Sequence, residues 1–196
     1  MTTLDNVSAH PSHLPRGPTL PAHRLPDLPS RLAIPDQSRH TGAPPAAFNT
    51  APADSVRRTL LGCLHSHRWA DRVTAHRPYP DLGSLLAAAD EAAYDLTPAD
   101  VTEALAAESL PELPEGTYEA AHTALNAAYA AYEARFGHVF VICVNGTPPD
   151  EALNHVLTAI RSRLANDPED ERLVVAEELR HLAKARLADA LRGAGL

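Results

Sequence analysis

Residues 125–144, which read LNAAYAAYEARFGHVFVICV, decide the fold. Up to Phe136 the apolar side chains recur at helical spacing, and Gly137 is a natural stop for that helix. The run that follows, 139–144, is β-branched and aromatic and by itself indicates a buried strand. The chain contains no second strand candidate that could pair with this run.

An extended segment buried among helices has backbone N–H and C=O groups without a ladder, and those groups need other partners. A polar ligand bound to the main chain of 139–144 would supply them. The alternatives are a short helix, or a strand that pairs with a second copy of the chain across a dimer interface.

Helical patterns account for the rest of the chain from residue 46 onward. Start signals stand at Thr50, Asp81, Thr97 and Thr147. The expected helices carry the segments Val56 to Leu64, Trp69 to Thr74, Leu82 to Ala89, Pro98 to Glu108, Tyr118 to Phe136, Leu153 to Leu164, and Leu173 to Leu187.

The first 45 residues differ in character from this part of the chain. They hold nine of the eighteen prolines and almost no periodic apolar pattern. Closely spaced prolines forbid a continuous helix. We therefore expect a disordered tail over 1–45 and one helical domain over 46–196.

Composition narrows the classes of partner. The net charge is −8 and the pI is near 5.7, which argues against nucleic acid or an anionic membrane as the main partner. No apolar run is long enough to span a membrane, and the N-terminus lacks a secretory signal, so a cytoplasmic protein is expected. Cys63 and Cys143 are too few for a disulfide scaffold or a cysteine-built zinc site.

Four polar residues are candidates for chemistry, and each has an ordinary alternative. His122 lies on the apolar face of the helix over 118–136, where a core histidine is as acceptable as a catalyst. Arg163 borders an apolar stripe, from which it could hold a carboxylate or simply form a surface salt bridge, whereas Arg161 points away from that stripe. Glu108 and Glu119 flank a Pro-rich stretch and either face a cleft or are solvated.

Several segments, in order and at plausible spacing, match one known family. They are Phe48-Asn49, Leu61-Gly62-Cys63-Leu64-His65-Ser66-His67-Arg68-Trp69, Arg77-Pro78-Tyr79, Leu125-Asn126-Ala127-Ala128-Tyr129, Arg135 to Cys143, Arg163-Leu164-Ala165-Asn166, and Arg186-Leu187. Through these segments, roughly residues 46–191 resemble the 2-oxo-4-hydroxy-4-carboxy-5-ureidoimidazoline (OHCU) decarboxylase family of the urate-to-allantoin pathway.

The resemblance implies an all-α fold, a compact multi-helix bundle with one irregular extended segment, which forms a homodimer and uses no cofactor or metal. It implies a small anionic ureidoimidazoline substrate that loses its carboxylate as carbon dioxide, after which the enolate is protonated to S-allantoin. It also implies that main-chain groups of Phe140, Val141, Ile142 and Cys143 bind the substrate, and that Arg163 is the substrate-holding arginine.

The chain departs from the family pattern at the catalytic residues. The family's His-Pro pair is absent from Ala106-Ala107-Glu108-Ser109-Leu110-Pro111, where Glu108 takes roughly the place of the histidine. The family's Ser-x-x-Glu-Gln motif is also missing. We therefore expect Glu108 to be the proton donor, because partial burial would favour its protonated form, with His122 as the alternative donor.

Two other functions are compatible with these departures. The first is a catalytically inactive paralogue that binds a small molecule or a partner as a helical dimer. The second is a dimeric interaction module whose pocket has no role. Fold-level similarity alone does not transfer activity between members of a family.

Deletion of residues 1–45 tests the expected domain boundary. Because this Pro-rich stretch has little apolar surface to bury, its removal should lower the melting temperature by less than about 5 °C. Thermal unfolding of the full chain and the truncated chain, followed by circular dichroism, measures the difference. A larger decrease would show that the first 45 residues belong to the folded domain.

Overall fold

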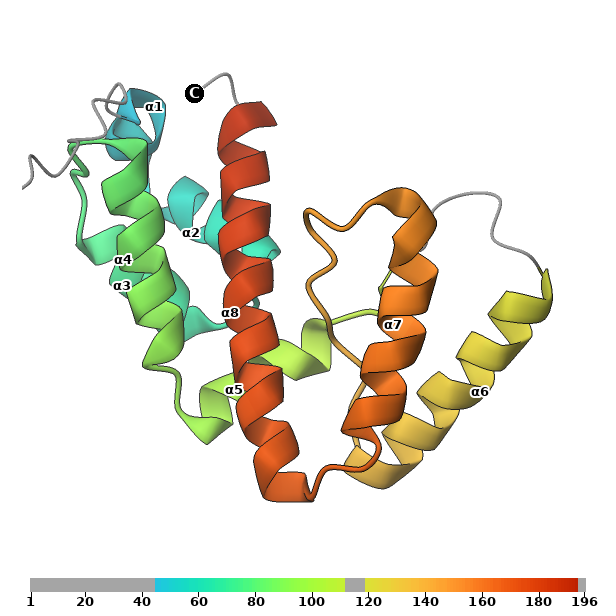
Figure 1. Cartoon of the computed structure of the whole chain (residues 1–196). Helices are drawn as coiled ribbons and strands as arrows, with labels where there is room; N and C mark the ends of the chain where they lie inside the picture. Colours follow the sequence, from blue (N-terminus) through green and yellow to red (C-terminus); the bar gives the residue numbers. More distant parts are fainter. Residues whose placement is uncertain (1–44, 112–118, 194–196) are drawn as a thin grey trace, which may run out of the picture. The chain divides into compact units, whose positions relative to one another are not determined.

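The computed structural model describes residues 45–111 and 119–193, except for the side chains of 119–122. All regular structure in these ranges is helical, as expected from the sequence. The helices are α1 (Ala46–Thr50), α2 (Ala53–Cys63), α3 (His67–Ala75), α4 (Leu82–Tyr94), α5 (Pro98–Ala107), α6 (Glu119–Phe136), α7 (Pro149–Arg163) and α8 (Pro168–Gly193) (Figure 1). The expected tail over 1–45 lies outside the described residues, apart from Pro45, and remains a prediction.

Local start signals explain where several helices begin. The carboxylate of Asp81 accepts a hydrogen bond from the N–H of Ser84, 2.7 Å away, and caps α4. Thr97 and Asp100 form a reciprocal capping box at the start of α5. The start expected at Thr50 is wrong, because Thr50 ends the short helix α1 and Pro52 precedes α2.

The first of two cores lies where α8 packs against α4, α2 and α5, with α3 against α2 and α4 (Figure 1). The buried positions of α8 recur every four residues and are Glu171, Val175, Leu179, Ala183, Leu187 and Leu191. Leu173, which we expected on this stripe, is 69% exposed. It lies two residues from both Glu171 and Val175, about 200° around the helix axis from each, and therefore on the side opposite the buried face.

The second core lies between α6 and α7, which pack side by side. The expected apolar face of α6 is confirmed at Leu125, Tyr129 and Tyr132, which are buried against Val156 and Ile160 of α7. None of the helices in the described ranges is both long and apolar enough to cross a membrane.

The segment over 139–144 lies between the two cores. It is neither helix nor strand, and Gly137 and Gly146, both with positive φ, stand on either side of it. Val139 and Val141 pack in the first core, whereas Phe140, Ile142 and Val144 pack in the second. This alternation is typical of an extended chain and explains why the whole run is apolar: both of its faces are buried.

Trp69 anchors the short helix α3 to its neighbours. Its indole ring is completely buried, and its Nε1–H donates to the carbonyl of Ala89 in α4 at 2.9 Å. The hydroxyl of Ser66 accepts from the backbone N–H of Trp69 and caps α3. A large apolar side chain with a satisfied polar atom is a strong source of stability in a core.

Replacement of Trp69 by Ala should lower the free energy of unfolding by about 3–5 kcal/mol, because it leaves a large cavity between α3 and α4. Urea unfolding followed by circular dichroism measures this change. Tyr94, which is 77% exposed at the end of α4, provides the control. Tyr94→Ala should change stability by no more than about 0.5 kcal/mol, and equal losses in the two variants would contradict the anchoring role of Trp69.

Candidate functional site

Two polar side chains hold the main chain of the segment between the cores. Nη1 of Arg163, at the end of α7, donates to the carbonyl oxygen of Val141 at 2.6 Å. The backbone N–H of Cys143 donates to Oε2 of Glu178, on α8, at 2.8 Å. These charge-assisted hydrogen bonds take the place of a β-ladder on one side of the segment.

The peptide groups in between have no such partners. Among the described residues, the N–H and C=O groups of Phe140 and Ile142 make no hydrogen bond, although Ile142 is only 4% exposed. The two bonded groups, the C=O of Val141 and the N–H of Cys143, belong to alternate residues and flank Ile142, as expected where successive residues direct their polar groups to opposite sides. Buried main-chain groups without partners are uncommon, and a polar ligand can satisfy them.

Arg163 lies inside the protein, together with the buried residues of α7, which excludes the surface salt bridge that was its ordinary alternative. Its Nε donates to Oε1 of Glu171 at 2.7 Å, its Nη2 donates to the hydroxyl of Tyr132 at 3.0 Å, and its guanidinium group stacks over the ring of Phe140. Glu171 is completely buried and also accepts from Asn166 at 2.8 Å. Arg161 is exposed, as expected.

A second ion pair lies near Cys143. Both Oε atoms of Glu108, which follows α5, accept hydrogen bonds from Nη1 and Nη2 of Arg186 on α8, at 2.7 and 2.8 Å. Nη1 of Arg186 also donates to the carbonyl of Cys63 at 3.1 Å. The Glu108 side chain is only 5% exposed, which confirms its expected burial, whereas that of Arg186 is 38% exposed. The expected protonated form of Glu108 is not the one seen, because both of its oxygens act as acceptors toward Arg186. Among the described residues, Nε and one Nη2 hydrogen of Arg186 have no partner.

Arg186 also interacts electrostatically with both cysteines. The hydrogen bond from Arg186 to Glu108 raises the pKa of the guanidinium, and Cys63 and Cys143 add smaller contributions of the same sign. Burial raises the pKa of the Cys63 thiol to about 11, an effect that the positive charge of Arg186 partly offsets. Cys63 is therefore a neutral thiol near neutral pH, which does not favour a nucleophilic role.

We define the candidate site as Glu108, Ile142, Cys143, Glu178 and Arg186. The sequence did not single out Glu178 or Arg186 as site residues, although Arg186 lies in the last of the matched segments. The spacing of Glu178 and Arg186 could have indicated that both face the same site, because residues eight apart on a helix lie within about 80° of each other around its axis. Within the described ranges, no group of three or more His, Cys, Asp or Glu side chains could hold a metal ion.

Two candidates from the sequence cannot be placed relative to this site. His122 lies in the first turn of α6, and its side chain is outside the part of the chain that the structure describes. The same holds for Glu119. The role of His122 as an alternative proton donor therefore stays a prediction.

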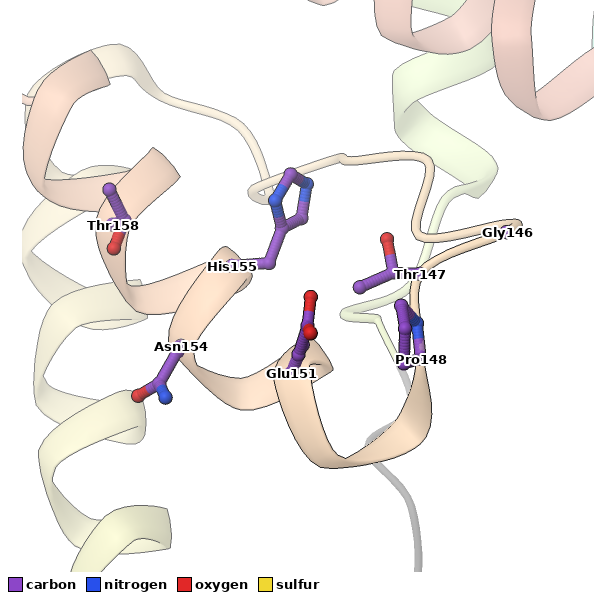
Figure 2. A pocket seen from close by; sticks show the side chains of 7 residues that line it. All are labelled: Gly146, Thr147, Pro148, Glu151, Asn154, His155 and Thr158. Carbon is purple, nitrogen blue, oxygen red and sulfur yellow. The ribbon is translucent and has the colours of Figure 1, made fainter.

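A separate hollow of about 500 Å³ lies at the N-terminal half of α7. Figure 2 shows Glu151 and His155 one helical turn apart on α7. The residues that line it are Gly146, Thr147, Pro148, Glu151, Asn154, His155 and Thr158. None of them belongs to the candidate site, and the hollow is open to solvent and lined mainly by exposed residues.

A protein-family model described as OHCU decarboxylase matches residues 49–115 and 109–188. The chain belongs to the OHCU decarboxylase family. The two matched parts overlap between α5 and α6, the stretch where the sequence lacks the Ser-x-x-Glu-Gln motif. Membership in the OHCU decarboxylase family confirms the resemblance that the sequence motifs indicate. No curated protein matches the chain.

Solved structures share the fold of this family member. A crystal structure of (S)-allantoin synthase aligns with a TM-score of 0.60 and 22% identity, over 76% of this chain and 53% of that chain. A crystal structure of OHCU decarboxylase in the presence of (S)-allantoin aligns with a TM-score of 0.59 and 20% identity, over 72% of this chain and 99% of that chain. This family member thus spans about half the length of the allantoin synthase and nearly the whole of the OHCU decarboxylase.

The buried thiol next to Arg186 predicts a specific dependence of stability on pH. The pKa of Cys63 is raised from 9.0 to about 11, so between these values unfolded chains have lost a proton that folded chains retain. The free energy of unfolding should therefore fall as pH rises through this range, by up to about 1.4 kcal/mol per pH unit.

Urea unfolding at several pH values between 8.5 and about 10 measures this slope. Tyrosines, with an ordinary pKa near 10, contribute equally to the wild type and to a Cys63 variant, so the difference between the two isolates the thiol. Cys63→Ala should remove the contribution and give a flatter dependence. Identical slopes in the wild type and in Cys63→Ala would show that the thiol is not buried as the structure describes.

Proposed function

We propose that this chain is an enzyme that decarboxylates 2-oxo-4-hydroxy-4-carboxy-5-ureidoimidazoline to S-allantoin in urate catabolism. Membership in the OHCU decarboxylase family supports the reaction class. The observation that carries the proposal is the set of buried N–H and C=O groups of Phe140 and Ile142, which make no hydrogen bond among the described residues. Cys143, the residue after Ile142, interacts electrostatically with Arg186.

These groups match the chemistry of a small ureidoimidazoline acid. The peptide N–H groups of Phe140 and Ile142 can donate to carbonyl or carboxylate oxygens, and their C=O groups can accept from ureido N–H groups. The unpaired Nε of Arg186 offers a charged donor to an anion. Donors fixed in a buried segment stabilise a developing oxyanion without having to reorganise during the reaction.

The reaction needs the departure of carbon dioxide and the addition of one proton. The bond between the ring carbon and the carboxylate breaks, and its electron pair stays in the ring as an enolate. A proton from solvent, carried by Glu108, then completes S-allantoin. Glu108 must first take up that proton, because both of its oxygens accept hydrogen bonds from Arg186 in the substrate-free protein.

Glu108→Gln tests this assignment. It should reduce turnover at least about a hundredfold and leave binding nearly intact, because Gln keeps the size of the side chain but cannot carry the proton. The rate at which the purified protein forms S-allantoin from freshly prepared substrate is measured by circular dichroism and compared with the spontaneous rate. Glu103→Gln is the matched control and should keep full activity, because Glu103 lies on α5, the helix that Glu108 follows, and is paired with His67.

Two results would contradict parts of this proposal. A comparable loss in His122→Asn, with activity retained in Glu108→Gln, would make His122 the donor. A wild-type protein that shows no rate above the spontaneous one but binds allantoin would support the alternative, a catalytically inactive paralogue that binds a small molecule.

The proposal includes a homodimer, which the family resemblance implies, and a cytoplasmic location. Light scattering coupled to gel filtration measures the mass in solution, and a monomer at working concentration would contradict the dimer. Arg163 remains a proposed contributor to substrate binding. It acts through the segment that it holds, because its hydrogen bonds go to Val141, Glu171 and Tyr132.

A further inference from the structure

Helix α8 presents two carboxylates to the segment that carries the free peptide groups. Glu171 acts through Arg163, which bonds to the carbonyl of Val141. Glu178 accepts the N–H of Cys143 directly, at 2.8 Å. The two glutamates are seven residues apart, close to two full turns, so they lie on the same side of α8. One helix face thus holds the segment at two points.

These two contacts set the direction of the free groups as well as the held ones. Because successive residues of an extended chain direct their peptide groups to opposite sides, a fixed orientation at Val141 and Cys143 also fixes Ile142 between them. Glu178 contacts the segment through its main chain, at the N–H of Cys143.

We propose that Glu178 is a positioning residue: by accepting the N–H of Cys143, it keeps the unpaired N–H and C=O of Ile142 directed at the substrate. This inference rests on the proposed function. Glu178 does not itself touch substrate or transfer a proton. A neutral acceptor of the same length is sufficient for this role, so Gln can replace Glu at this position, whereas Ala cannot.

Three variants separate this role from others. Glu178→Ala should lower kcat at least about tenfold with a smaller change in KM, because misdirected peptide groups lose contact mainly with the charge that develops in the transition state. Glu178→Gln should restore kcat to within about threefold of the wild type. Glu177→Ala is the matched control, since Glu177 is exposed and paired with Arg180, and it should leave both constants unchanged.

Hydrogen exchange measured by mass spectrometry gives a readout that does not depend on activity. Backbone amides in 138–146 should exchange faster in Glu178→Ala than in the wild type, and at the wild-type rate in Glu178→Gln. The melting temperature of each variant is measured alongside, so that a change confined to this segment is distinguished from general destabilisation.

Each alternative result overturns the positioning role. Equal losses of kcat in Glu178→Gln and Glu178→Ala would mean that the charge of Glu178 itself acts on the substrate. Unchanged kcat in Glu178→Ala, with a lower melting temperature, would make the contact purely structural.

An inactive wild type would contradict the proposed function but not this inference, which calorimetry with allantoin would then decide. Affinity at least about tenfold weaker in Glu178→Ala alone would support it. Equal affinity in the wild type and both variants, or no binding by the wild type, would overturn it.

Discussion

The structure depends on one requirement: the polar main chain of a buried segment must find partners in the absence of a β-ladder. Arg163 meets part of this requirement at Val141, but a buried guanidinium needs a counter-charge of its own. Glu171 provides it and is in turn held by Tyr132 and Asn166. Each of these side chains is acceptable in the interior because the next one is present.

The same arrangement connects the interior to the candidate site. Side chains satisfy only one side of the segment, so the peptide groups of Phe140 and Ile142 remain available on the other. Helix α8 carries both Glu178 and Arg186, and therefore joins the support of the segment to the pair with Glu108. In this family member the ion pair lies where the sequence departs from the family's His-Pro motif, so a glutamate and an arginine together occupy that region.

Helices and caps were predictable because their causes are local: Asp81 and Thr97 act on residues three positions away. The apolar segment was recognisable from its composition, and its lack of a ladder followed from the absence of other strands. The phase of a single helix could not show that Arg163 is buried, since the groups that surround it come from α6, α8 and the segment itself. The pair of Glu108 and Arg186 joins residues far apart in sequence and has no local signal.

The alternation of side chains between two cores makes the segment unusually sensitive to changes in chain length. Insertion or deletion of a single residue between Gly137 and Val141 would shift the register by one. Phe140 would then face the core built for valines, and the peptide groups now held by Arg163 and Glu178 would exchange places with the free ones. We therefore expect this stretch to accept substitutions but not insertions or deletions.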